Sequence, residues 1–127
     1  MPKADNGKRR RAERHGRFGE WLAAAYLLAQ FYRIRALRHK TPFGEIDLIA
    51  ERFGKLVFVE VKMRANRAGE EDGLNAVNRR RIVNAARHYL SRHPALAARD
   101  MRFDVILLTP FFWLRHEKAA FDASAYL

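Results

Sequence analysis

The segment GEIDLIAERFGKLVFVEVK, residues 44–62, constrains the fold of this chain more than any other stretch. It contains two apolar runs separated by a short turn, a pattern that predicts a pair of buried strands. Each run carries charges where a core would exclude them: Glu45 and Asp47 in the first, Glu60 and Lys62 in the second. Burying a charge without a partner costs several kcal/mol. The pattern therefore predicts a compensating partner or a functional site.

The turn between the two runs sets their register. A two-residue loop at Phe53-Gly54 pairs the neighbouring residues Arg52 and Lys55, so that the indices of every facing pair sum to 107. A four-residue loop gives the same sum, whereas three or five residues would rotate the two sets of charges apart unless a bulge corrected them.

In that register Asp47 faces Glu60, and Glu45 faces Lys62. Facing residues have Cβ atoms roughly 4.5–5.5 Å apart, and like charges so placed repel each other. A proton or a cation between Asp47 and Glu60 would remove the repulsion, and two carboxylates suit a hard divalent ion such as Mg²⁺. The alternative is a solvated sheet face on which Glu45 and Lys62 form an ordinary ion pair.

The flanking sequence predicts a single α/β or α+β domain with a mixed sheet, in the order αβββαβ. We expect a helix over about 18–31, a strand over 31–38, a second helix over about 74–93 that ends before Pro94, and a strand over 101–109. The tail from Pro110 is ambiguous, with an edge strand and a short helical turn as one interpretation. The apolar stripe expected for the first helix consists of Phe18, Trp21, Leu22, Ala25, Tyr26, Leu28 and Ala29.

Composition favours a polyanionic partner, nucleic acid first. The 127-residue chain has a net charge of +11, and residues 1–14 form a basic arm, expected to be disordered, ahead of the domain at 15–127. It has no cysteine, no apolar leader and no run long enough to span a membrane, so we expect a cytoplasmic protein without membrane contact. The five histidines show no ligand spacing and receive no role.

The two charged strands also carry a family resemblance. Asp47 followed by Glu60-Val61-Lys62 resembles the PD-(D/E)xK nuclease pattern. The whole set is similar to the YraN-type family of small bacterial predicted endonucleases, which is related in fold to archaeal Holliday-junction resolvases. The markers are Gly19-Glu20, GEIDLIA at 44–50, FVEVK at 58–62 and RFDV at 102–105. The resemblance implies a restriction-endonuclease-like fold, a central mixed sheet flanked by helices.

The resemblance also implies roles for individual residues. Asp47, Glu60 and the Val61 carbonyl would hold Mg²⁺ or Mn²⁺, with Glu20 as a further ligand, and Lys62 would orient or activate the attacking water. Catalytic residues would thus be Asp47, Glu60 and Lys62. Glu45 belongs to the signature, and we expect it to support Lys62. Asp104, within RFDV, is expected to be held by structural hydrogen bonds.

Basic residues near these positions are candidates for nucleic-acid binding. Arg64 and Arg67 follow Lys62, and Arg79, Arg80 and Arg81 lie in the predicted second helix, where their charge suits phosphate. Family members often open that helix with Lys-Gln, and this chain has Asn78-Arg79 instead, which leaves a dedicated lysine role in doubt.

These observations predict a metal-dependent nucleic-acid phosphodiesterase, endonuclease-like, with DNA favoured over RNA and branched DNA as one substrate class through the resolvase analogy. The same analogy allows a symmetric homodimer. Two alternatives remain open: a non-catalytic nucleic-acid-binding protein that retains the nuclease fold, and a basic interaction protein whose charged strands form an ion-pair network.

Overall fold

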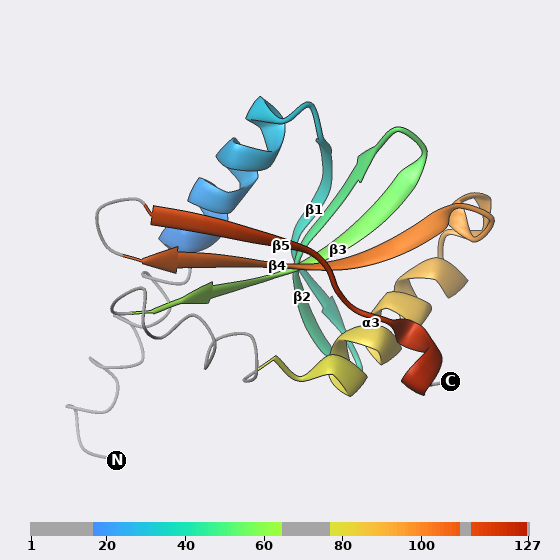
Figure 1. Ribbon diagram of the computed structural model, residues 1–127. Coiled ribbons are helices and arrows are strands. Elements are labelled where there is room, and N and C mark those ends of the chain that lie inside the picture. The colour runs from blue at the N-terminus through green and yellow to red at the C-terminus, as the bar shows by residue number, and fades with distance from the viewer. Residues whose placement is uncertain (1–16, 65–76, 110–112, 127) are drawn as a thin grey trace, which may run out of the picture.

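The computed structural model describes residues 17–64, 77–109 and 113–126 and contains a five-stranded sheet in the order β1-β2-β3-β4-β5 (Figure 1). Strands β3 and β4 pair in parallel and the other neighbours are antiparallel. The strands are β1 Arg33–Thr41, β2 Gly44–Arg52, β3 Lys55–Met63, β4 Asp100–Thr109 and β5 Trp113–Phe121. The helices are residues 17–29, α3 Arg79–Ser91, and the 3₁₀ turns η2 Pro94–Leu96 and η4 Ala123–Tyr126.

This arrangement confirms the predicted α/β class and the order αβββαβ, to which β5 adds an edge strand in the ambiguous tail. It is consistent with a restriction-endonuclease-like fold. The basic arm at 1–14 lies outside the described residues.

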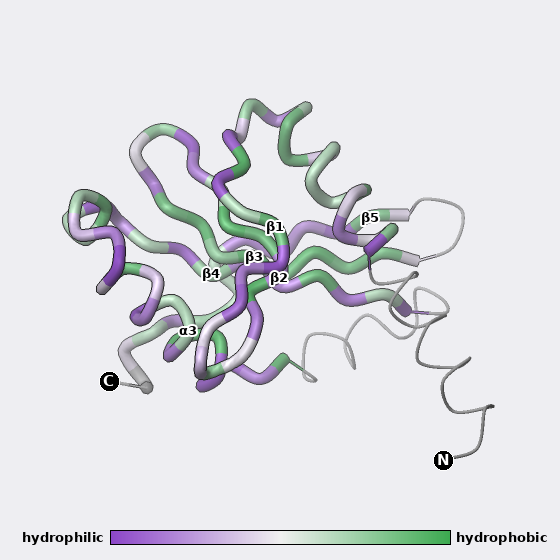
Figure 2. Tube along the Cα trace, turned by 180° about the vertical axis from the view of Figure 1, so that it is seen from behind, coloured by the Kyte–Doolittle hydropathy of each residue, from purple (hydrophilic) through white to green (hydrophobic). Residues whose placement is uncertain are grey.

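The two helices cover opposite faces of the sheet, so the sheet has two cores (Figure 1). Ile49, Phe58 and Leu107 pack on the α3 side, while Leu48, Val57 and Val59 pack against the first helix. Neighbouring residues of one strand thus enter different cores, as strand geometry requires. Figure 2 shows the hydrophobic colour running along the central strands β3 and β4, with hydrophilic residues toward their ends.

The face that the first helix buries differs from the prediction. The helix packs through Ala23, Ala24 and Leu27, all at most 4% exposed. The predicted stripe was wrong in five of its members, which are exposed: Phe18, Trp21, Ala25, Leu28 and Ala29. The small alanine side chains allow close approach to the sheet, which large aromatic side chains at the contact would prevent.

The second helix begins later than predicted. Residues 77 and 78 are not helical, and α3 starts at Arg79 because Asn78 caps it, its side-chain oxygen accepting a hydrogen bond from the Arg81 backbone N–H at 3.1 Å. Asparagine is a favoured N-cap because it satisfies a donor that the first turn leaves free. Residues 74–76 of the predicted helix lie outside the described residues.

The predicted register of β2 and β3 is confirmed. Arg52 pairs with Lys55 across the two-residue turn, and the ladder runs to Leu48 and Val59, with index sums of 107 throughout. It stops there, so the prediction that Asp47 pairs with Glu60 and Glu45 with Lys62 in the ladder was wrong. Figure 1 shows β2 and β3 separating from the middle of the sheet. We call this separation the fork.

The backbone of β1 explains a second departure. Arg38 has a φ of 51°, which is unusual for a strand residue, and it lies opposite Asp47 between the pairs Leu37↔Leu48 and His39↔Ile46. Ile46 packs on the α3 side while Leu48 packs on the other, so the regular alternation of side chains along β2 fails between them. The irregular residue reverses the alternation at this point.

Candidate functional site

The fork brings Asp47 and Glu60 together without a ladder pair between them. One Asp47 carboxylate oxygen accepts a hydrogen bond from the Val61 backbone N–H at 2.8 Å, in place of a backbone carbonyl. Asp47 is half-buried. Glu60 is only 5% exposed although its side chain ends in an ionisable carboxyl group. The two carboxyl groups are close enough to hydrogen-bond when one is protonated. The sequence therefore predicted that Asp47 and Glu60 lie close together, but the two residues do not face each other in the β2–β3 ladder.

Glu20 reaches the same place from the first helix. Gly19, one residue before it, lies against the end of β3: a Cβ atom there would come within 3.0 Å of Met63 Sδ. The absence of a side chain lets the helix approach the sheet, and Glu20 is only 8% exposed, within hydrogen-bonding reach of Asp47. The structure therefore brings together three of the predicted acids.

The pKa values show how strongly this cluster resists full ionisation. Burial and then the charge of Asp47 raise the pKa of Glu60 to about 7, and burial and Asp47 likewise raise the pKa of Glu20 to about 7. Burial also raises the pKa of Asp47, against the opposing effect of the Val61 hydrogen bond. At neutral pH the cluster therefore retains bound protons. The same repulsion between carboxylates that favours these protons also favours binding of a cation in their place.

Basic side chains already lie among the acids. Lys62 Nζ is 3.6 Å from Glu60 Oε1, and the Arg81 guanidinium is 3.3 Å from the same oxygen. Arg38 lies 3.5 Å from Glu20 and 3.9 Å from Glu45. Glu45 thus forms an ion pair with Arg38, and among the described residues no ion pair joins it to Lys62, so its support of Lys62 stays a prediction. Lys62 thus lies beside the buried carboxylate of Glu60.

Arg38 is the site residue that sequence reasoning missed. The sequence placed it only within the strand predicted over residues 31–38. Its positive φ turns it toward the acids, and no local motif in RIRALR signals that conformation.

The side chain of Arg81 passes directly over Gly44 on its way to Glu60. A Cβ atom on Gly44 would lie 2.7 Å from Arg81 Cδ, and Gly44 has a φ of 124°. Both facts require glycine at the start of GEIDLIA, the first because of space and the second because of backbone conformation. The family signature glycine therefore has a physical role in this chain.

The donor set fits a divalent cation with an open coordination sphere. Glu60 Oε2 is fully buried and has no hydrogen-bond partner, so this carboxylate oxygen remains available to a ligand. Among the described residues, no group of three or more acidic or histidine side chains could hold a metal ion by itself. Mg²⁺ commonly uses one or two carboxylates and completes its octahedron with water and phosphate oxygens. Asp47, Glu60 and the Val61 carbonyl would meet that need.

The predicted phosphate-binding arginines separate in space. Arg81 points into the acid cluster, whereas the Arg79 guanidinium lies 5.7 Å from the Phe121 ring centroid. Arg80 is exposed. Arg64 continues the β3–β4 pairing through its backbone N–H, which donates to the Leu108 carbonyl at 2.8 Å. Arg67 lies outside the described residues.

Asp104 occupies a separate buried network, as its structural role predicts. Arg102 and His116 bind its carboxylate at 2.8 and 2.7 Å, and the Ala119 backbone N–H donates to it at 3.0 Å. Burial opposes ionisation, but the hydrogen bonds from His116 and Arg102 outweigh it and lower the pKa of Asp104. His116 also contacts the Tyr26 hydroxyl at 3.0 Å. Sequence reasoning gave this histidine no role because its partners are distant in sequence.

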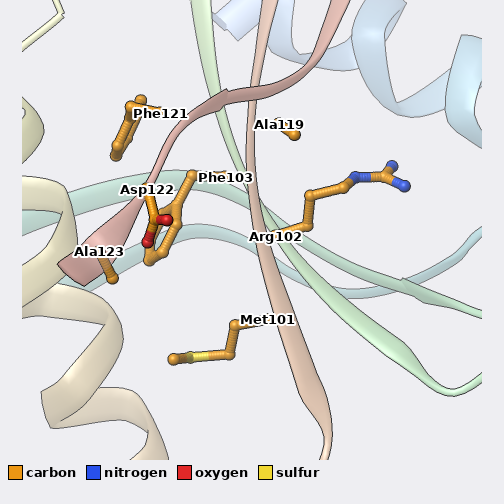
Figure 3. A pocket seen from close by; sticks show the side chains of 7 residues that line it. All are labelled: Met101, Arg102, Phe103, Ala119, Phe121, Asp122 and Ala123. Atoms are coloured by element: carbon orange, nitrogen blue, oxygen red, sulfur yellow. The ribbon is translucent and has the colours of Figure 1, made fainter.

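A cavity of about 470 Å³ lies elsewhere, where β4, β5 and the start of η4 meet (Figure 3). Its lining includes Phe103, Phe121 and Asp122, and none of the predicted site residues. Figure 3 shows the Arg102 guanidinium pointing away from these side chains. We therefore assign the candidate site to the fork and not to this cavity. No helix within the described ranges is long and apolar enough to cross a membrane.

Comparison with known proteins supports the resemblance. The chain matches the Uncharacterised protein family UPF0102 over residues 19–108, which contain Glu20, the fork and α3. A UPF0102 protein of Bradyrhizobium diazoefficiens is 44% identical over 97% of this chain and 92% of its own length. One from Mesorhizobium japonicum is 44% identical over 95% and 97%, and one from Rhodopseudomonas palustris is 49% identical over 89% and 87%. The chain belongs to the UPF0102 family, the YraN family that its motifs resemble.

Proposed function

We propose that this protein is a metal-dependent phosphodiesterase that hydrolyses nucleic acid. The observation that carries the proposal is the fork, where Asp47 and Glu60 meet beside Lys62 and leave the buried Glu60 Oε2 without a partner. Buried polar atoms in folded proteins are nearly always hydrogen-bonded, and either a proton shared with Asp47 or a bound cation would satisfy this oxygen.

Asp47, Glu60 and the Val61 carbonyl would hold Mg²⁺ or Mn²⁺, with Glu20 beside them. When bound, such an ion supplies Lewis-acid chemistry, withdrawing charge from phosphoryl oxygens and favouring deprotonation of water. Lys62 Nζ, held 3.6 Å from Glu60, would orient the attacking water and stabilise the charge that develops on the phosphoryl group.

The cations around the acids suit a phosphodiester substrate. A divalent ion at Glu60 would compete with Arg81 for the same carboxylate, and a phosphate entering the fork would offer that arginine a new partner. The net charge of +11 would attract the backbone of nucleic acid irrespective of sequence. DNA is proposed ahead of RNA through the resolvase resemblance, as is a symmetric homodimer.

The test incubates purified protein with single-stranded, duplex, flapped and four-way DNA and with RNA, in Mg²⁺ or Mn²⁺ and in EDTA. Glu60→Gln and Lys62→Met accompany the wild type. Lys118→Met is the matched control, because it removes the same positive charge at an exposed position of β5. We expect metal-dependent cleavage that both site variants lose and the control retains. Binding without cleavage on every substrate would favour the non-catalytic alternative, and equal cleavage by all variants would indicate a contaminant.

A further inference from the structure

The β2–β3 turn carries a large aromatic side chain at a position whose backbone conformation disfavours one. Phe53 and Gly54 are its two central residues, with φ values of 51° and 77°. Two-residue hairpin turns with two positive φ values favour Asn-Gly, because a bulky side chain is strained in this conformation. Phe53 is nevertheless 86% exposed, so it gains little from burial in return.

A second exposed aromatic residue of the same kind lies nearby. Phe31, just after the first helix, has a φ of 68° and is 85% exposed. Arg52 connects the two residues: its Nη1 donates to the carbonyl of Gln30, and its guanidinium carbon lies 5.1 Å from the Phe53 ring centroid. Arg52 therefore contacts the Phe53 ring and the backbone next to Phe31, and its guanidinium carbon lies 4.2 Å from the Tyr32 ring centroid.

A cavity of about 170 Å³ lies beside this arginine, lined by Tyr32, Arg52, Phe53, Lys55, Val57 and Arg102. Three of the six are cationic and none is acidic. Glu51 pairs with three arginines outside the lining, Arg33, Arg35 and Arg99, whereas Asp104 binds Arg102 of the lining. Asp100 is the register neighbour of Lys55 in the parallel β3–β4 ladder. The cavity thus combines positive charge with aromatic surface.

We propose that Phe31, Arg52, Phe53 and Lys55 form a binding surface for unpaired nucleobases of single-stranded nucleic acid. Aromatic rings stack on successive bases while neighbouring cations hold the phosphates, and every base offers a face for stacking. This deepens the proposed function, on which it rests for the identity of the polymer. A substrate of the proposed nuclease would then contain an unpaired segment.

The distance between this surface and the fork suits one continuous strand of nucleic acid. Arg52 follows Asp47 by five positions along β2, which corresponds to about 17 Å at the rise of a β-strand. Figure 1 shows the β2–β3 turn at the opposite end of β3 from its arrowhead. Stacked nucleotides advance about 3.4 Å each along one strand, so about five would connect the two places.

The test measures binding of fluorescent oligo-dT, oligo-U and a DNA duplex by anisotropy in EDTA, where cleavage cannot interfere. Phe53→Asn suits the turn better than the native residue, so we expect its thermal midpoint to equal or exceed that of the wild type. We expect its affinity for both single strands to fall roughly fivefold or more, with a smaller effect on the duplex. Phe53→Trp should keep the affinity, and Phe31→Asn should lower it.

Leu28→Ala, at an exposed apolar position of the first helix, is the matched control and should change nothing. Unchanged single-strand binding by Phe53→Asn, an equal loss on duplex and single strand, or no binding by the wild type would overturn the inference. Glu60→Gln separates this result from the proposed function: it should lose cleavage and keep single-strand binding. Cleavage that depends on Glu60, together with normal binding by Phe53→Asn, would discard the binding surface and keep the nuclease.

Discussion

Asp47 accepts a hydrogen bond from the Val61 backbone N–H at 2.8 Å, and this contact marks the point where β2 and β3 stop pairing. A side-chain carboxylate takes the place that a backbone carbonyl holds in a regular ladder. The strands can therefore separate without leaving the Val61 N–H unpaired. The separation makes room for Glu60, Lys62 and Glu20 around one point, so the local geometry and the candidate chemistry share one cause.

This contact predicts a difference between two substitutions of Asp47. Asn at position 47 keeps an oxygen that can accept from Val61, whereas Ala does not. We expect Asp47→Ala to be less stable than Asp47→Asn by roughly 1–3 kcal/mol, the usual consequence of an unpaired buried donor. Chemical denaturation at pH 7 measures the difference. Equal stabilities would mean that the hydrogen bond does not hold the fork, and neither variant should cleave nucleic acid.

The raised pKa values predict that stability depends on pH in a specific direction. The folded-state pKa values of Glu20 and Glu60 are about 7, above their ordinary value of 4.5, so folding favours the protonated forms. Their stabilising contribution is complete below about pH 4.5 and is lost as pH rises through 7. We expect the metal-free protein to lose roughly 2–4 kcal/mol between pH 5 and pH 8 from this source.

Urea denaturation at pH 5 and pH 8 measures this loss, and two variants isolate its origin. Glu20→Gln and Glu60→Gln cannot ionise at these positions, so each should flatten the dependence. Added Mn²⁺ should restore stability to the wild type at pH 8 and have little effect at pH 5, where protons compete with the metal. A wild-type slope that both glutamine variants reproduce would contradict the assignment.

The close approach of Arg81 to Gly44 predicts an energetic coupling. Gly44→Ala introduces a Cβ at 2.7 Å from Arg81 Cδ and a strained φ, and we expect it to destabilise the protein by about 1–3 kcal/mol. Gly54→Ala provides the control, because its φ is also positive but nothing lies within 4 Å of the new atom. Arg81→Ala should relieve the steric part, so the double variant should be more stable than the sum of the single effects predicts. Strict additivity would refute the contact.

The Asp104 network predicts a large effect far from the fork. Asp104→Asn leaves Arg102 and His116 without their buried carboxylate, and we expect a loss of about 3 kcal/mol. Glu117→Gln removes the ion pair between Glu117 and Arg115, whose side chains are 40% and 35% exposed, respectively. This substitution should change stability by less than about 1 kcal/mol. Thermal unfolding of both variants tests the contrast. Similar small losses would show that the buried network contributes little.

Much of the sheet could be predicted because its signals are local. The Phe53-Gly54 turn predicted the register of β2 and β3, which the structure confirms from Arg52–Lys55 to Leu48–Val59. Asp47 and Glu60 were found because charges interrupt apolar strands, and Glu20 was found only through the family pattern. Such features depend on residues close together in sequence, where turn chemistry and side-chain periodicity decide the outcome.

The errors arose where tertiary contacts overrule local pattern. The aromatic residues of the first helix satisfied the helical period, but Ala23, Ala24 and Leu27 fit the close helix–sheet contact better. Arg38 entered the site through a positive φ that sequence does not reveal, and it lies 3.9 Å from Glu45. His116 meets Asp104 only because β4 and β5 pair, a contact that no spacing in the sequence indicates.

The central claim is that the fork binds a divalent metal ion through Asp47 and Glu60. Calorimetric titration of Mn²⁺ into the wild type, Asp47→Asn, Glu60→Gln and Lys62→Met at pH 7.5 tests it directly, without knowledge of the substrate. We predict one site per chain that is lost in the two carboxylate variants and retained in Lys62→Met, where removal of a nearby positive charge favours the ion. Absence of binding at millimolar Mn²⁺, or binding unchanged in both carboxylate variants, would contradict the account.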